Sequence, residues 1–242
     1  DRIYRPARII GPEEKIPVLP HDDGLPVRTL HGGVTLNHLA WASILGLKAG
    51  VFGRLPLDEG GRFLRDGMRR LGIRPHLTTD GSASAFSLIF VDPEGGRAIY
   101  MSRGATGETG PREIRTRHGA FLRRAAIVTT EISQLPLPAV VAVLSEAKRA
   151  GIPTVLDIDI PPSDALQTLG SDRDLEKALK LATHLKPSRA AAAELVGRAT
   201  PLTAARKLRA RYGPRAVLIT DGPRGCAVSS GDFEGSIPAI KV

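Results

Sequence analysis

The strongest constraint on the fold is a regular alternation of strand-like and helix-like segments in the second half of the chain. Apolar runs predict strands at residues 126–130, 154–158, 216–220, 226–229 and 235–240, and amphipathic spacing predicts helices at 138–150, 172–182 and 201–212. Strands that alternate with helices of this length form βαβ units, in which helices cover both faces of a parallel sheet. We therefore predict an α/β fold with three layers around a parallel sheet.

Two β-rich segments in the first half of the chain do not fit this alternation. Residues 2–30 hold short apolar pieces, one of them at 7–10, separated by prolines that suit edge strands and turns. Residues 84–103 contain two strand-like runs on either side of a hairpin signal at 92–96. We predict that both segments form one small sheet over the carboxyl ends of the parallel strands, where open α/β folds bind ligands.

The segment between them has the pattern of a further α/β unit. Apolar residues spaced by three and four predict a helix at 33–46, and a buried strand is expected at 49–55. Asp58 is a suitable first-turn residue for a second helix, which we expect to end at Gly72.

Composition and charge exclude several classes of protein. Hydrophobic residues make up 42% and charged residues 24% of the 242 residues, as in a globular domain. No run approaches the roughly 18 consecutive apolar residues of a membrane helix, so we expect no membrane partner. The net charge of +9 includes no long basic tract and aromatic residues are only 4%, so we expect no nucleic-acid partner. A single cysteine, Cys226, excludes an internal disulfide and favours a cytoplasmic location.

Two glycine-containing turns are candidate ligand sites. Gly32 and Gly33 precede a helix and Asn37 follows one turn later, so backbone N–H groups and an amide could meet a ligand. A plain turn with Asn37 in solvent explains the same residues. The second turn, residues 220–225, follows a strand, and its two glycines could bring backbone N–H groups around a phosphate. A tight turn into an antiparallel strand is the alternative there.

A pair of carboxylates is a candidate metal site. Asp157 and Asp159 stand at the end of a predicted strand, and such a pair can hold Mg²⁺ through water. Ordinary loop polarity explains the two residues equally well.

The order and spacing of these motifs resemble the ribokinase-like carbohydrate kinases, also called the phosphofructokinase-B type. The matching residues span essentially all of 1–242 and are Gly32-Gly33-x-x-x-Asn37, Gly53-Arg54, 58–64, 71–73, 87–91, Lys186-Pro187-Ser188, 194–197 and 219–225. The resemblance implies a parallel-sheet α/β domain with a β-sheet lid, here formed by about 2–30 and 84–103. It also implies transfer of the γ-phosphoryl group of ATP, with Mg²⁺, to a hydroxyl of a sugar, sugar acid or sugar phosphate.

The resemblance further implies roles for individual residues. The residues that match substrate-binding positions are Asp1, Gly32, Gly33, Asn37, Arg103 and Glu131, and those that match nucleotide-binding positions are Ser188, Thr220, Gly222 and Gly225. The catalytic residue is unknown, because the aspartate that acts as general base in the family is expected beyond Val242. We expect the first strand and the C-terminal part of the fold to lie outside 1–242 as well. Relatives often pair through their lids, so a homodimer is also expected.

Two departures from the family pattern bear on activity. The Asn-x-x-Glu segment that organises Mg²⁺ in the family reads Ser188-Arg189-Ala190-Ala191 here, and Ala191 cannot coordinate a metal. The segment that supplies the base and the anion hole does not occur, so we expect residues 1–242 alone to be inactive. The alternative function is therefore a degenerate family member that binds sugar or nucleotide with little or no phosphoryl transfer.

Overall fold

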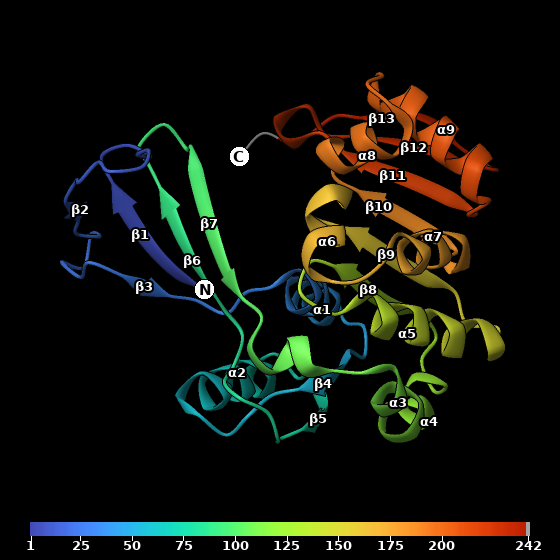
Figure 1. Cartoon of the computed structure of the whole chain (residues 1–242), viewed down its shortest axis with the longest axis horizontal. Helices are drawn as coiled ribbons and strands as arrows, with labels where there is room; N and C mark the ends of the chain where they lie inside the picture. Colours follow the sequence, from blue (N-terminus) through green and yellow to red (C-terminus); the bar gives the residue numbers. More distant parts are fainter. Residues whose placement is uncertain (241–242) are drawn as a thin grey trace. The chain divides into compact units, whose positions relative to one another are not determined.

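The computed structural model describes residues 1–240 (Figure 1). The chain divides into a first unit, Asp1–Glu108, and a second unit, Thr109–Val242. The α/β class predicted from the sequence is confirmed, with parallel strands at the centre of the second unit.

The second unit is built on a six-stranded sheet with the order β13-β12-β11-β10-β9-β8. Its strands are β8 (Val128–Ile132), β9 (Thr154–Ile158), β10 (His184–Pro187), β11 (Ala216–Thr220), β12 (Cys226–Ser230) and β13 (Glu234–Ile237). The first four are parallel to one another, and β12 and β13 join as antiparallel strands. Strands β9 and β11 have the predicted bounds, whereas β13 ends three residues before the predicted end at residue 240.

The helices of the second unit share one core with this sheet. They are α3 (Pro111–Glu113), a π-helical turn (Ile114–His118), α4 (Gly119–Leu122), α5 (Leu137–Arg149), α6 (Pro162–Thr168), α7 (Asp172–Leu181), α8 (Arg189–Val196) and α9 (Pro201–Tyr212). Buried side chains alternate along the strands, so that Leu185, Val217 and Ile219 join the core while Lys186 and Leu218 stay partly exposed. The core therefore lies between α5, α7, α8 and α9 and one face of the strands.

Local signals explain where these helices begin. Ser171 accepts a hydrogen bond from the backbone of Asp174, and the side chain of Asp174 bonds back, which forms a capping box at α7. At α9 the Thr200 side chain accepts a hydrogen bond from the backbone of Thr203, Pro201 is the first residue, and Gly213 ends the helix in the left-handed conformation.

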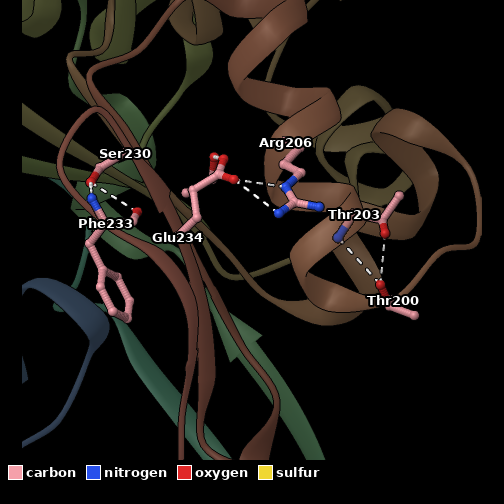
Figure 2. A network of polar contacts seen from close by, with 7 residues as sticks. Thr200, Thr203, Arg206, Ser230, Phe233 and Glu234 are labelled. Atoms are coloured by element: carbon pink, nitrogen blue, oxygen red, sulfur yellow. Dashed lines mark hydrogen bonds and ion pairs between the residues drawn. The ribbon is translucent and has the colours of Figure 1, made fainter.

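A polar network ties the β12–β13 hairpin to α9 (Figure 2). Arg206 of α9 donates to Glu234 of β13 at 3.0 Å, and Ser229 of β12 donates to the same carboxylate at 2.7 Å. At the hairpin turn, the Ser230 hydroxyl bonds to the backbone of Phe233. These contacts fix the hairpin that follows the second glycine-containing turn.

The first unit contains two sheets. The larger one has the order β2-β1-β6-β7 with β3 also paired to β1, and its strands are β1 (Arg2–Pro6), β2 (Val18–Leu19), β3 (Arg28–Thr29), β6 (Phe86–Val91) and β7 (Arg97–Ser102). The predicted piece at 7–10 forms no strand, because Pro6 ends β1 and the loop bonds locally, with Glu14 accepting from Arg8 and from the backbone of Gly11.

The smaller sheet of the first unit pairs two parallel strands. They are β4 (Gly50–Arg54) and β5 (Arg74–Thr78), and α1 (Val34–Ile44) and α2 (Glu59–Arg70) precede and connect them. A small core of Leu55, Met68 and Ile73 packs beside them. A 3₁₀ turn (Gly104–Glu108) ends the unit.

Candidate functional site

The turn before α1 brings Asp1, Gly32 and Gly33 together. Asp1 is joined to Leu30 by two hydrogen bonds of 2.9 Å, one from its amino group and one to its carbonyl oxygen. Its carboxylate lies directly against Gly32, since a Cβ added there would stand 2.5 Å from Cγ of Asp1. Gly33 precedes the first residue of α1 with φ 99°, a conformation that L side chains rarely adopt. The backbone therefore requires glycine at Gly33, whereas at Gly32 the absence of a side chain leaves the space that the Asp1 carboxylate occupies.

Asn37 lies at the same end of α1. Its backbone N–H donates to the carbonyl oxygen of Gly33 at 2.9 Å, and the residue is exposed. The Asp1 carboxylate accepts hydrogen bonds, and the Asn37 amide both donates and accepts them. Together these groups can bind the hydroxyl groups of a ligand at this helix end.

His31 holds the turn against α2, which sequence reasoning missed. Its ring stacks on Phe63 with centroids 4.1 Å apart, and its Nε2 lies 3.0 Å from the carbonyl oxygen of Phe63. Gly67 leaves the space for this ring, because any side chain there would overlap it. A glycine inside a helix costs about 0.5–1 kcal/mol relative to alanine, so Gly67 was the available signal of close packing.

Asp58 joins α2 to the chain that enters β6. Its carboxylate accepts hydrogen bonds from the backbone of Gly61 at 2.7 Å and from the backbone and hydroxyl of Ser84 at 2.7 and 2.5 Å. The hydroxyl of Ser84 lowers the pKa of this carboxyl below its ordinary value, and the two backbone bonds act in the same direction. The predicted start of α2 at Asp58 is confirmed.

Arg103 and Glu131 belong to different units. Arg103 follows β7 and is partly buried beside Gly107 of the 3₁₀ turn. Glu131 lies on β8, where it is in register with Asp157 of β9. Both assignments as substrate-binding residues stay predictions.

The turn 220–225 closes on itself through its own backbone. Its N–H groups at Asp221, Arg224 and Gly225 donate within the turn, at 2.8, 3.2 and 3.0 Å, and Pro223 has none. Among the described backbone contacts of 221–225, only the N–H of Gly222 is left for a ligand. The positive φ of 55° at Gly222 and 92° at Gly225 shapes the turn, so the expected ring of backbone N–H donors is not formed.

The neighbouring strand adds side chains to this turn. Ser188 pairs with Thr220 in a parallel bridge, and its hydroxyl accepts from the backbone of Ala191 at the start of α8. The first residue of α8, Arg189, reaches Asp221 at 3.2 Å. Sequence reasoning did not mark Arg189, because residues 189 and 221 meet only when β10 and β11 pair.

Asp221 holds a second arginine as well. Arg224 donates from Nε and Nη2 to the two carboxylate oxygens, both at 2.8 Å. These bonds, with those from Arg189, lower the pKa of Asp221 from 3.8 to about 2. The turn therefore carries two guanidinium groups against one carboxylate.

A cavity of about 530 Å³ opens between α8 and α9 beside this turn. Its lining is small and mostly apolar, with two arginines, and consists of Arg189, Ala190, Ala192, Ala193, Gly197, Arg198, Ala199, Pro201, Ala204 and Ile219. Arg189 thus belongs both to the cavity and to the Asp221 cluster.

Residues 7–242 match the family of pfkB carbohydrate kinases. The chain belongs to this family. A curated relative, the bifunctional ribokinase/ribose-5-phosphate isomerase A of Fructilactobacillus sanfranciscensis, is 26% identical over 213 residues, 86% of this chain and 37% of the relative. The 5-dehydro-2-deoxygluconokinase of Halalkalibacterium halodurans is 29% identical over 140 residues, 54% of this chain and 41% of that protein.

The fold of this pfkB-family chain is that of solved ribokinases. The structure of Arabidopsis thaliana ribokinase complexed with ribose and ATP superimposes with a TM-score of 0.73 at 20% identity, covering 98% of this chain and 74% of that one. The chain spans about two fifths of the length of the two curated relatives. None of the helices in the described part of this pfkB-family chain has the length and apolar character needed to cross a bilayer.

The donor groups in this pfkB-family chain do not favour a cation between Asp157 and Asp159. Asp157 is buried and its carboxylate receives a hydrogen bond of 2.6 Å from Nζ of Lys186, which already balances its charge. Asp159 is exposed. Within residues 1–240, no cluster of three His, Cys, Asp or Glu side chains is arranged to hold a metal ion. We assign no step to Mg²⁺ at these two residues.

Proposed function

We propose that the chain is part of an ATP-dependent kinase that transfers a phosphoryl group to a hydroxyl of a sugar, sugar acid or sugar phosphate. Membership of the pfkB family supports the carbohydrate kinase class. The relatives named for ribokinase and for 5-dehydro-2-deoxygluconokinase activity favour a sugar or a sugar acid as the acceptor. The ribokinase solved with ribose and ATP favours ATP as the donor.

The observation that best supports a sugar site is the contact between Asp1 and Gly32. The Asp1 carboxylate lies against Gly32, close to the start of α1, and its oxygens can accept hydrogen bonds there. We assign Asp1, Gly32, Gly33 and Asn37 to the acceptor sugar. Arg103 and Glu131, which also match substrate-binding positions of the family, are proposed as further substrate-binding residues.

The turn 220–225 is proposed as the nucleotide site. Thr220 offers a hydroxyl, Ser188 is bridged to it, and the N–H of Gly222 is not bonded within the turn. No described residue matches the general base that the family resemblance implies, so we assign no catalytic residue within 1–240.

One observation favours the alternative of a binding protein with weak transfer. Ala191, where the family pattern has a glutamate, is fully buried in the core of the second unit. A carboxylate at this position would lose its hydration, so the local packing suits alanine and not a metal-organising glutamate.

An ADP-release screen tests the proposal. The full-length protein, of which we propose the chain to be a part, is incubated with ATP and Mg²⁺ and with panels of sugars, sugar acids and sugar phosphates. Release of ADP that depends on one acceptor supports the kinase. Calorimetric binding of an acceptor and of ATP without ADP release supports the binding protein, and failure to bind any acceptor in the panels contradicts both. The Asp1→Asn variant is expected to weaken the response, whereas Asp232→Asn, an exposed change far along the sequence, serves as the control.

Self-association and location complete the proposal. The edge strand β7 exposes Ile99, Tyr100 and Met101, which supports pairing of two copies through this sheet. Sedimentation of the chain and of Tyr100→Glu tests this, and equal masses for both would contradict it. A cytoplasmic location is proposed from the single cysteine.

A further inference from the structure

The two arginines at Asp221 carry more positive charge than this single carboxylate balances. Asp221 supplies one negative charge, and Arg189 and Arg224 supply two positive ones. Both guanidinium groups bond to the same oxygen, Oδ1, at 3.2 and 2.8 Å. One positive charge therefore remains at the turn.

The donors of the arginines are only partly used. A guanidinium has five N–H donors. Arg224 gives Nε and Nη2 to Asp221, and Arg189 gives Nη1, while no described contact uses Nη1 of Arg224 or Nη2 of Arg189. The side chains of Arg189 and Arg224 are 57% and 66% exposed, against 12% for Asp221. The carboxylate is covered, and the donors face outward.

The backbone of the turn leaves a single N–H, that of Gly222, for an anion. As described above, the N–H groups of Asp221, Arg224 and Gly225 are bonded inside the turn and Pro223 has none. An anion at this turn would therefore depend on side chains, and the arginines offer the fork that matches phosphate oxygens.

Space for a ligand lies beside one of these side chains. Arg189 lines the cavity of about 530 Å³ between α8 and α9, and Figure 1 shows these helices next to β11 and β12. The position of Arg189 depends on two elements at once, because it starts α8 and is held by the turn after β11.

We propose that Arg189 and Arg224, held in place by Asp221, form a clamp for the phosphate groups of the nucleotide. The clamp rests on the proposed kinase function for the identity of its ligand. The sequence suggested backbone N–H donors for a phosphate at this turn. In the clamp the donors are instead side chains from two separate elements.

Binding of inorganic tripolyphosphate to the 242-residue chain tests the clamp without any turnover. Dissociation constants for tripolyphosphate, ATP and adenosine are measured by calorimetry for wild type, Arg189→Met and Arg224→Met. We expect each variant to bind tripolyphosphate and ATP about tenfold more weakly, since each loses a charge-assisted contact, and adenosine about as well as wild type. Arg173→Met, which removes an exposed arginine on α7, is the matched control and should change nothing.

A second set of measurements distinguishes direct contact between the arginines and the phosphate from an effect on the shape of the turn 220–225. Arg224→Lys keeps the charge but not the fork, so its tripolyphosphate affinity should fall between those of wild type and Arg224→Met. The salt dependence of tripolyphosphate binding should become shallower in each methionine variant, and melting temperatures verify that all variants fold. No tripolyphosphate binding by wild type, or equal affinities in folded methionine variants, would overturn the clamp.

The outcomes for the clamp and for the kinase are distinct. If the arginine variants lose tripolyphosphate affinity while no acceptor supports ADP release, the clamp stands and the kinase proposal fails. If an acceptor supports ADP release with unchanged KM for ATP in both methionine variants, the kinase stands and the clamp fails.

Discussion

The carboxylate of Asp1 occupies the space that the missing side chain of Gly32 leaves. A Cβ on residue 32 would stand 2.5 Å from Cγ of Asp1, and the amino and carbonyl groups of Asp1 are hydrogen-bonded to Leu30, two residues before Gly32. The glycine thus positions an acceptor group at the start of α1. A glycine pair by itself indicates only a turn, and this contact is the reason why we propose that the pair belongs to a ligand site.

Gly32→Ala should therefore reduce sugar binding more than stability. The new methyl group would displace the Asp1 carboxylate, a flexible group that can swing aside at little cost to the fold. We expect roughly tenfold weaker binding of the acceptor found in the ADP-release screen, about 1.4 kcal/mol, measured by calorimetry. Gly11→Ala is the control, because nothing lies within 4 Å of a Cβ there. Equal acceptor affinity in Gly32→Ala and wild type would contradict the assignment of Asp1.

Asn37→Ala should also weaken binding of the acceptor sugar. The side chain is exposed at the end of α1, so it has no internal role that alanine would disturb. Loss of one hydrogen-bonding group to the sugar should cost about 0.5–1.5 kcal/mol in binding. Trp41→Ala, an exposed change on the same helix, should leave the calorimetric dissociation constant unchanged. If both variants behave alike, Asn37 is a surface residue only.

Gly222→Val and Gly33→Val should each raise the KM of a different substrate. Both glycines have positive φ, so valine strains each turn locally. Gly222→Val should raise KM for ATP more than KM for the sugar, and Gly33→Val should do the reverse. Both constants come from steady-state ADP release after circular dichroism verifies folding. If Gly222→Val raised only the KM for the sugar, the assignment of the nucleotide to the turn 220–225 and of the sugar to the turn before α1 would have to be reversed.

Gly67→Ala should destabilise the first unit. Its methyl group would overlap the His31 ring, which cannot move freely because it stacks on Phe63 and bonds to its carbonyl. We expect the free energy of unfolding to fall by about 1–3 kcal/mol in urea titrations, although alanine is the better helix former. In a His31→Ala background the same change should be neutral or stabilising. A loss of equal size in both backgrounds would rule out this clash.

Acid should weaken the Asp221 cluster in a defined range. The arginines lower the pKa of Asp221 to about 2 from 3.8, so the folded state binds its proton less readily than the unfolded chain. The resulting stabilisation is complete above about pH 4 and is lost as the pH falls towards 2. The difference in free energy of unfolding between wild type and Asp221→Asn should shrink over this range. Asp232→Asn, exposed in the same unit, provides the control, and a constant difference for Asp221→Asn would contradict the pairing.

The elements whose signals are local could be predicted from the sequence. Strands β9 and β11 and helix α9 have the predicted bounds, because alternating apolar runs, caps and a terminal glycine act within a few residues. Asp58 was identified as a helix start for the same reason. The family resemblance, which depends on the order of such signals, was also readable and is confirmed.

The contacts between charged residues that lie far apart in the sequence depend on how the strands pair. Strand β10 has four residues and ends in Pro187, so its own pattern is weak, and it forms because β9 and β11 pair with it on both sides. That pairing sets Lys186 against Asp157 and brings Arg189 to Asp221. Such contacts join residues about thirty positions apart, where no local spacing carries information. Strand register alone fixes them, and register is settled by the burial of a whole sheet face.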